Sequence, residues 1–306
     1  MTASRIVVGV DGSPTSREAM RWAACLGRAL GDEVVAVHSV GLLEAAHDPA
    51  SPPESWRAGV RDLVEHTWCA PLDDAGVAHR VEVVDGHPVD VLLRVADREA
   101  AALVVLGARG VGAHEEQALG STSLRVLQAA RAPTLVVPAP REGEPAADGE
   151  MRLRHILVGT DRSAPSLAAL EVAADIAGTL GGSLSVLEAF AYEPPFPLGP
   201  TAAVSSRGEE QALDRTAALV EEHVRAIRDR GIAVQVVVRS GDPAATLLQV
   251  AEDVDADLIV VGSRGRGDPA EPLLGSVART VAAHARRATL VVPAAAGRVH
   301  LAPDPS

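Results

Sequence analysis

Two halves of this 306-residue chain carry the same ordered set of short sequence blocks. Ile6–Ser13 reads IVVGVDGS, and Ile156–Ser163, 150 positions later, reads ILVGTDRS. The blocks that end at Gly107, Ser121 and Pro138 recur 155 positions later. Repeats of this length and order indicate a tandem duplication. The chain therefore has to fold as one unit of about 150 residues built twice.

The duplication sets the domain boundaries that we expect. We place the first domain at residues 1–140, a linker at 141–152, the second domain at 153–295 and a tail at 296–306. The linker is rich in Gly, Pro and acidic residues, as connecting segments often are. The change of offset from 150 to 155 predicts a five-residue insertion, which we place in the proline-rich stretch Glu193–Pro200, corresponding to Asp48–Glu54 of the first half.

Each half alternates continuous apolar runs with segments of helical periodicity. In the first half the expected strands are Arg5–Val10, Glu33–Ser39, Ala78–Val84, Ala102–Leu106 and Thr134–Val137. Helical patterns connect them, including Pro88–Arg98 and Ser121–Ala130. Continuous Val, Leu and Ile runs are typical of parallel strands buried on both faces. We therefore predict an α/β fold of two tandem doubly wound (Rossmann-like) domains, each a five-stranded parallel sheet with helices on both faces.

Charge and composition exclude several classes of function. The formal net charge is −13, aromatic residues make up 2% of the chain, and all 28 basic residues are arginine. Without lysine the chain has no Walker-type P-loop and no Schiff base. An acidic chain with few aromatic side chains is poorly suited to nucleic acid or anionic membranes, so we expect neither as a partner. No apolar run approaches the ~20 residues of a transmembrane helix, and we expect a cytoplasmic protein.

The candidate site follows from where ligands bind in such folds. Open parallel sheets bind ligands beyond the carboxyl ends of their strands, where the winding direction reverses. Asp11 and Asp161 directly follow the first strand of each half. A glycine-containing loop follows the fourth strand, and a Gly-Ser pair begins the next helix. These residues are Gly107, Arg109, Gly110, Gly120 and Ser121 in the first half, and Gly262, Arg264, Gly265, Gly275 and Ser276 in the second.

These residue types suit a nucleotide. Glycines allow positive φ and close approach of a ligand, and a helix N-terminus offers amides and a favourable dipole to phosphate. Arginine can add a bidentate contact to phosphate, and the aspartate can face a ribose or hold a magnesium ion indirectly. Either feature alone is commonly a turn or a helix cap. Their recurrence in both halves with the same spacing favours a binding site.

The spacing Gly-x₂-Gly-x₉-Gly-Ser, together with Val8–Ser13, resembles the universal stress protein family over nearly the whole chain. The resemblance implies the strand order 3-2-1-4-5 in each domain. It also implies ATP binding, with the adenine and ribose near Asp11 or Asp161 and the end of the second strand, and the phosphates on the glycine loop. The nucleotide contacts expected in addition to the loop residues are Gly9, Asp11, Ser39, Thr122 and Ser123 in the first half and Gly159, Asp161, Ala189 and Val277 in the second.

The sequence departs from the family pattern in places. Ser39 and Ala189 stand where the family commonly has valine beside the adenine. The hydroxyls of Thr122 and Ser123 are replaced by Val277 and Ala278, so the second site has fewer phosphate donors. Within the nine-residue spacer, the residues 114–116 (HEE) correspond to 269–272 (PAEP). We therefore expect the first site to be the better ATP site.

Other motifs predict no chemistry. Gly265–Ala270 fits G-x-G-x-x-A, but prolines stand where its helix would begin, and the first half does not preserve it. His38 and the corresponding Glu188 are interpreted as local structure, and the remaining histidines lack metal-ligand spacing. We assign no catalytic residue, because no general base is shared by the two halves.

Two classes of function follow. The first is an ATP-binding protein that acts as a nucleotide-dependent regulator in the stress response through an unknown protein partner. The alternative is a slow Mg-dependent ATP hydrolase or nucleotidyl-transfer enzyme, with Asp11 or Asp161 near the metal. The short last strands, Thr134–Val137 and Thr289–Val292, are expected to pair within the chain as an intramolecular pseudo-dimer. A homodimer of the whole chain stays open.

Overall fold

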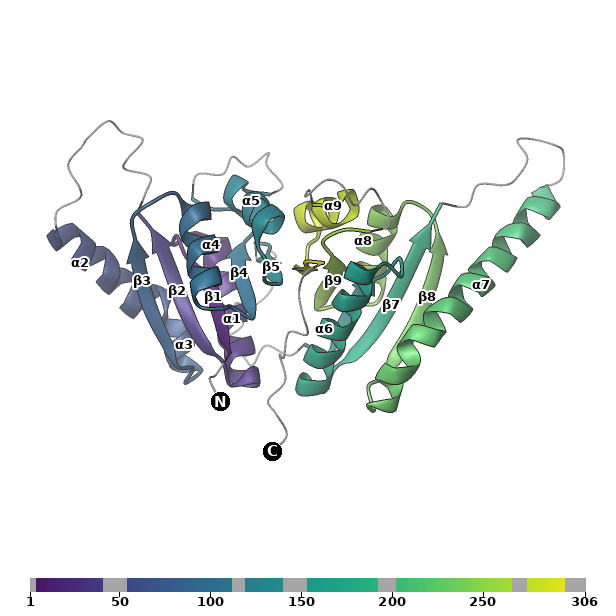
Figure 1. The fold of residues 1–306 in the computed structure, drawn as a ribbon, viewed down its shortest axis with the longest axis horizontal. Coiled ribbons are helices and arrows are strands. Elements are labelled where there is room, and N and C mark those ends of the chain that lie inside the picture. The colour runs from purple at the N-terminus through teal and green to yellow at the C-terminus, as the bar shows by residue number, and fades with distance from the viewer. Residues whose placement is uncertain are drawn as a thin grey trace.

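The computed structural model describes residues 4–40, 54–111, 119–139, 153–191, 202–265 and 274–294. Within these ranges, ten strands form one sheet in the order β3-β2-β1-β4-β5-β10-β9-β6-β7-β8 (Figure 1). The strands are β1 (Arg5–Gly9), β2 (Glu33–Ser39), β3 (His79–Val84), β4 (Leu103–Gly107), β5 (Thr134–Val137), β6 (His155–Gly159), β7 (Ser183–Phe190), β8 (Val234–Ser240), β9 (Leu258–Gly262) and β10 (Ala288–Val292). The paired strands are parallel except β5 and β10, and each half has the order 3-2-1-4-5. The predicted fold class is confirmed. We call β1–β5 with their helices the first domain and β6–β10 with theirs the second domain.

Helices cover both faces of the sheet. One face packs against α1 (Pro14–Leu30), α2 (Glu54–Leu63) and α3 (Ala70–Asp74) in the first domain, and against α6 (Ala164–Leu180) and α7 (Ala202–Asp229) in the second. The other face packs against α4 (Pro88–Arg98) and α5 (Ser121–Ala129), and against α8 (Pro243–Asp253) and α9 (Ser276–His284). Glycine ends the first helix of each domain, because Gly31 and Gly181 adopt φ of 72° and 68°.

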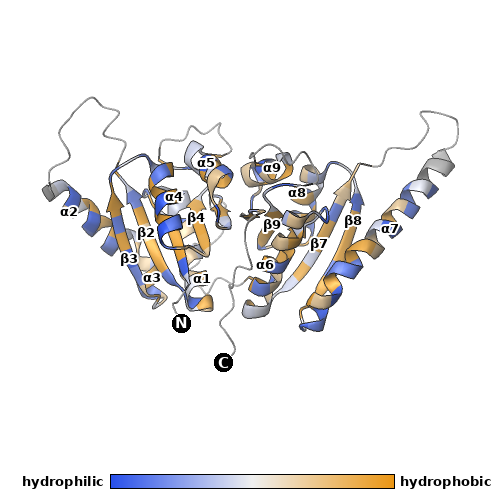
Figure 2. Ribbon diagram, in the orientation of Figure 1, coloured by the Kyte–Doolittle hydropathy of each residue, from blue (hydrophilic) through white to orange (hydrophobic). Residues whose placement is uncertain are grey.

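The strands are apolar on both sides, as Figure 2 shows by their orange colour. Successive side chains of a strand point to opposite faces. Ile6 and Val8 therefore pack in the cluster that includes α1, whereas Val7 packs in the cluster that includes α4. All three side chains are fully buried. This burial on both sides explains why the strands read as continuous apolar runs rather than alternating ones.

The connection between β2 and β3 contains a π-helical turn, Val64–Trp68, between α2 and α3. Val64, Cys69 and Leu72 are buried in these helical turns, and the first two are five positions apart. In α7 the corresponding inward positions are Val220 and Val224, four residues apart. The π turn therefore adds one residue to the first domain, a common cause of such a bulge.

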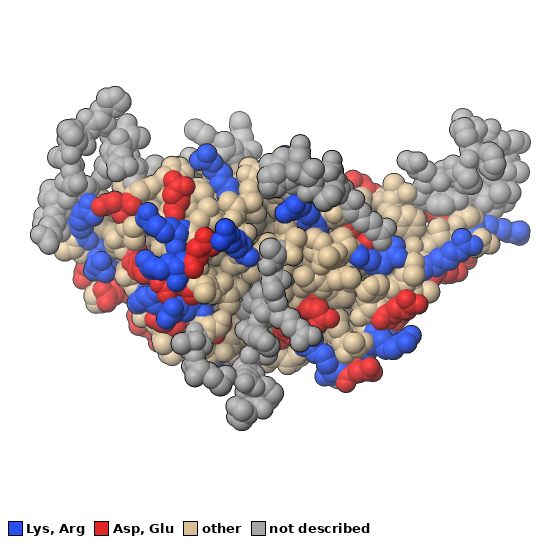
Figure 3. Space-filling model, viewed as in Figure 1, with Lys and Arg blue, Asp and Glu red and all other residues tan. Residues whose placement is uncertain are grey.

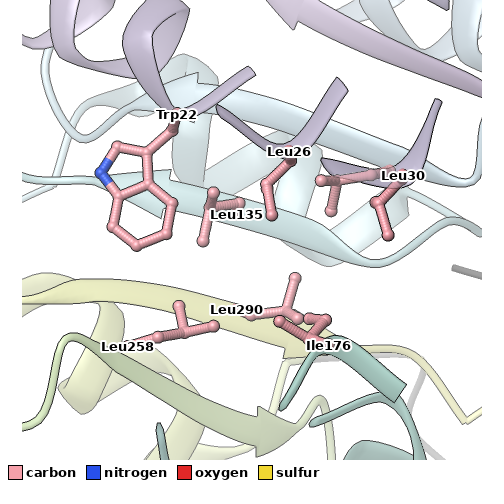
Figure 4. A pocket seen from close by; sticks show the side chains of 8 residues that line it. Trp22, Leu26, Leu30, Leu135, Ile176, Leu258 and Leu290 are labelled. Atoms are coloured by element: carbon pink, nitrogen blue, oxygen red, sulfur yellow. The ribbon is translucent and has the colours of Figure 1, made fainter. Parts of the chain in front are cut away.

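The two domains join at β5 and β10, as expected for an intramolecular pseudo-dimer. The two strands pair antiparallel, with Leu135 opposite Leu290. On one face of this seam, the α1 side chains Trp22, Leu26 and Leu30 lie across from Ile176 of α6 (Figure 4). Together with Leu103, Leu135, Leu258 and Leu290 they line a small apolar cavity. Both large core clusters contain residues of both domains, so the apolar core is continuous across the seam.

Charged side chains of both signs gather over the α4 and β3 side of the first domain (Figure 3). At the end of α4 the Glu99 carboxylate lies 2.8, 2.7 and 2.9 Å from the guanidinium nitrogens of Arg5, Arg80 and Arg98. The second domain places His155 at the position of Arg5, where its ring contacts the hydroxyls of Ser183 and Ser185, each at 2.9 Å. The same place in the repeat therefore holds ion pairs in one domain and histidine–serine contacts in the other.

Some expectations lie outside the described residues. These are the linker 141–152, the tail 296–306, the insertion at 193–200 and the spacer segments 114–116 and 269–272. In the part of the chain that the structure describes, none of the helices is long and apolar enough to cross a membrane.

Candidate nucleotide site

The candidate site lies where the winding of each sheet reverses. β1 pairs with both β2 and β4, and β6 pairs with both β7 and β9. From β1 the chain continues into α1 on one face, and from β4 it continues toward α5 on the other. The ends of these two neighbouring strands carry Asp11 and the glycine loop, which we define as residues 107–111 and, in the second domain, 262–265. This is the crevice in which open α/β sheets bind ligands.

Asp11 and the glycine loop make direct contact. The Asp11 carboxylate accepts hydrogen bonds from the backbone N–H groups of Ser13 and Val111, both at 3.0 Å. A Cβ on Gly110 would lie 2.5 Å from Asp11 Oδ2, and a Cβ on Gly265 would lie 2.5 Å from Asp161 Oδ2. The second glycine of the spacing is therefore needed in both domains because a carboxylate occupies the place of its side chain.

The first glycine of the spacing packs against the start of the first helix. A Cβ on Gly107 would lie 2.7 Å from the Thr15 carbonyl carbon, and one on Gly262 would lie 2.8 Å from the Ser166 nitrogen. The described glycines with positive φ do not include any glycine of the repeated spacing. The expectation that positive φ explains these glycines is wrong, because close packing within the protein requires them instead.

The third glycine closes the loop onto the helix start. The Gly120 N–H donates to the Ala108 carbonyl at 2.8 Å, and the Gly275 N–H donates to the Ser263 carbonyl at 2.8 Å. Ser121 and Ser276 follow as exposed first residues of α5 and α9, and Thr122 and Val277 are half-buried. Ser123 is buried and donates its hydroxyl to the Gly107 carbonyl at 2.7 Å. Ser123 therefore uses its hydroxyl within the protein, whereas Ser121 and Thr122 are partly accessible at the helix start.

The remaining expected contacts lie nearby with different surroundings. Gly9 and Gly159 pack tightly against leucines, since a Cβ would lie 2.6 Å from Leu106 in one and Leu247 in the other. Ser39 ends β2 and donates to the Gly86 carbonyl at 2.5 Å. Ala189 lies in β7 beside Arg239 of β8. Arg109 and Arg264 are half-exposed within the glycine loops.

Comparison with known proteins identifies the family of this chain. The sequence pattern of the family described as "Universal stress protein family" matches residues 2–138 and 152–293. A universal stress protein of Mycobacterium tuberculosis is 32% identical over 306 residues, covering 90% of each chain. One of Mycolicibacterium smegmatis is 32% identical, covering 94% of this chain and 96% of the other.

The chain belongs to the universal stress protein family.

The crystal structure of a universal stress protein from Archaeoglobus fulgidus shares the fold, with a TM-score of 0.67 over 96% of this chain and 100% of that chain, at 19% identity. A structure from Pseudomonas aeruginosa has a TM-score of 0.62 at 17% identity, covering 97% of this chain and 95% of the other. In both cases the similarity extends over the two domains together.

Beside Asp11, this universal stress protein has an aromatic contact that sequence reasoning missed. The Trp68 and His38 rings meet edge to face, with centroids 5.3 Å apart. His38 Nδ1 lies 2.8 Å from the Val10 carbonyl. A Cβ on Gly12 would lie 2.5 Å from Trp68, so Trp68 covers the residue directly after Asp11. Trp68 lies 30 positions from His38, and it belongs to none of the repeated blocks that would have signalled this contact.

The second domain fills the corresponding place with an ion pair. Arg162 stands at the position of Gly12 and Glu188 at that of His38. The Arg162 Nε and Nη2 atoms lie 2.8 and 3.0 Å from the Glu188 carboxylate, and Glu188 is 4% exposed. The positive charge of Arg162 is therefore neutralised by Glu188 rather than presented to a ligand. Among the described residues, His, Cys, Asp and Glu side chains do not gather in groups of three or more that could hold a metal ion.

Proposed function

We propose that this universal stress protein binds ATP at the carboxyl edge of its sheet and acts as a nucleotide-dependent regulator in the stress response. The observation that carries the proposal is the contact between Asp11 and the glycine loop, beside the hydroxyl-bearing N-terminus of α5. Residues 100 positions apart come together there. A carboxylate for a sugar and amide and hydroxyl donors for phosphate then face one crevice.

The residues present suit the parts of a nucleotide. Each oxygen of the Asp11 carboxylate accepts one N–H and keeps a lone pair for a ribose hydroxyl. The exposed hydroxyl of Ser121, the hydroxyl of Thr122 and the guanidinium of Arg109 are the donors for phosphate oxygens. Because the chain has no lysine, arginine and neutral donors have to hold the phosphates. A magnesium ion would be held by the phosphates, with Asp11 or Asp161 contributing through water.

Calorimetric titration of the purified chain with ATP and Mg²⁺ tests the proposal, and phosphate release is followed in the same samples. We expect saturable binding that Asp11→Asn weakens by about tenfold, because an amide NH₂ would oppose a backbone N–H where the carboxylate now accepts one. Absence of binding would overturn the proposal. Sustained phosphate release that Asp11→Ala abolishes would instead support the hydrolase alternative.

A further inference from the structure

The glycine loop of the first domain is held by three hydroxyl groups. Ser13 Oγ donates to the Arg109 carbonyl at 3.3 Å, and Thr15 Oγ1 donates to the same carbonyl. Ser123 Oγ donates to the Gly107 carbonyl at 2.7 Å. These three side chains are at most 5% exposed, so the bonds are shielded from water. The loop is thus tied to both the start of α1 and the start of α5.

The second domain has lost these donors. Pro165 stands at the position of Thr15 and Ala278 at that of Ser123, and neither side chain has a hydroxyl. Ser163, at the position of Ser13, turns its hydroxyl to Asp161 Oδ1 at 2.5 Å. The three side-chain bonds that hold the first loop therefore have no equivalents from these positions of the second domain. Val277 in place of Thr122 also removes a hydroxyl from the start of α9.

We propose that the chain binds one nucleotide tightly, in the first domain, and that Thr15 and Ser123 are the positioning residues that make this site the stronger one. A loop already fixed in its binding shape loses less conformational freedom when a ligand binds. The second loop lacks the hydroxyl bonds of Thr15 and Ser123, because Pro165 and Ala278 stand at those positions, and Val277 leaves it one phosphate donor fewer. This inference rests on the proposed function and specifies which of its two sites is used.

The first test is the stoichiometry of ATP binding to the full chain, measured by calorimetry. We expect one tight site and a second that fills only at concentrations at least ~10-fold higher, which corresponds to about 1.4 kcal/mol. Two sites of equal affinity would overturn the inference and leave the proposed function intact. Absence of any binding would overturn both.

Tryptophan fluorescence assigns the tight site to a domain. The three tryptophans, Trp22, Trp56 and Trp68, belong to the first half, and Trp68 lies against Gly12 beside Asp11. We expect the tight phase to change the emission, and we expect Trp68→Phe to remove most of that change. A tight phase without any change in emission would place it in the second domain and overturn the inference.

Paired substitutions test the two positioning residues. Thr15→Val removes the hydroxyl at nearly constant shape and should weaken the tight phase about tenfold, whereas Thr15→Ser should stay within about twofold of the original. Ser123→Ala should act like Thr15→Val. Thr134→Val is the matched control, since Thr134 is equally buried and its hydroxyl donates to the nearby Ala132 carbonyl at 3.2 Å, away from the glycine loop. Equal affinity of Thr15→Val and Thr15→Ser would contradict the positioning role.

A variant that is expected to bind ATP more tightly tests the proposal without relying on a loss of binding. The double substitution Val277→Thr and Ala278→Ser gives the start of α9 the two hydroxyls that Thr122 and Ser123 supply at the start of α5. We expect it to strengthen the weak phase at least threefold while leaving the tight phase unchanged. An unchanged weak phase would contradict the proposal, because the added hydroxyls are the groups to which it assigns the difference.

Discussion

The first and second domains share their strand order and differ beside the aspartate that follows the first strand. In the first domain Gly12 lies under Trp68, which meets His38 edge to face. In the second domain Arg162 reaches Glu188, and the pair fills the same region with opposite charges. Gly12 and Arg162 both have positive φ, of 79° and 63°. The two domains therefore share this backbone conformation but surround it with different side chains. We expect that exchanging a single one of these side chains between the domains would destabilise the fold.

The largest expected loss of stability follows from breaking the buried ion pair between Arg162 and Glu188. Glu188→Ala leaves the Arg162 guanidinium, whose side chain is 18% exposed, without its partner. Removing one member of a buried pair typically costs about 3 kcal/mol. Urea unfolding should show this loss. The double variant Arg162→Gly with Glu188→His should cost less than Glu188→Ala alone, and a loss below about 1 kcal/mol for the single variant would contradict the interpretation.

The next largest loss of stability is expected from adding a side chain at Gly12, which lies against Trp68. Gly12→Ala should destabilise the chain by about 2 to 3 kcal/mol, because the residue has φ of 79° and the added Cβ would lie 2.5 Å from Trp68. Gly31→Ala is the control, with a similar φ of 72° and no heavy atom within 4 Å of the added Cβ. It should cost about 1 kcal/mol. Equal losses in thermal unfolding would show that Trp68 does not restrict this position.

A third difference is Asp32, which the second domain replaces with Gly182. Asp32 is 7% exposed, its Oδ2 has no hydrogen-bond partner among the described residues, and burial raises its pKa to about 6. Because the folded pKa lies above the unfolded one, the charged form lowers stability above pH ~6, and this loss disappears as the pH falls toward ~4. Asp32→Asn should therefore raise stability by about 1 to 2 kcal/mol at pH 8 and by almost nothing at pH 4. A gain that does not change with pH would contradict this.

The smallest expected effect is at Glu99, where the first domain has ion pairs and the second has His155 with two serines. The hydrogen bond from Arg80 and the nearby Arg98 and Arg5 lower the pKa of Glu99. Its contribution is therefore present above the unfolded pKa and lost as the pH falls through the lower folded value. The arginine partners are 34% to 50% exposed, so solvent screening limits Glu99→Gln to under about 1 kcal/mol at pH 7. Urea unfolding in low and high salt checks this: the loss should shrink in 1 M salt, and a loss independent of salt would refute an ionic origin.

The sequence predicted the architecture because its signals are local. The bounds of β2, α4 and β5 agree with the structure to the residue, since apolar runs, Pro88 and Pro138 mark them. The repeat also predicted Asp11 and Gly110 as residues of one site, and the structure places the two in contact. What sequence reasoning missed depends on contacts between distant residues. The hydroxyl bond from Thr15 to the Arg109 carbonyl spans 94 positions, and the π turn at Val64–Trp68 has no local pattern that distinguishes it from an α-helix.

The pairing of β5 with β10 has a consequence for how the two sites can differ. When two identical chains associate about a two-fold axis, every substitution appears on both sides of the axis at once. Here both partners are encoded in tandem, so a change in one is not copied into the other. Their association also does not depend on protein concentration, because the partner is always attached. A gene that holds both halves can therefore keep one site for its original ligand while the other is released to change.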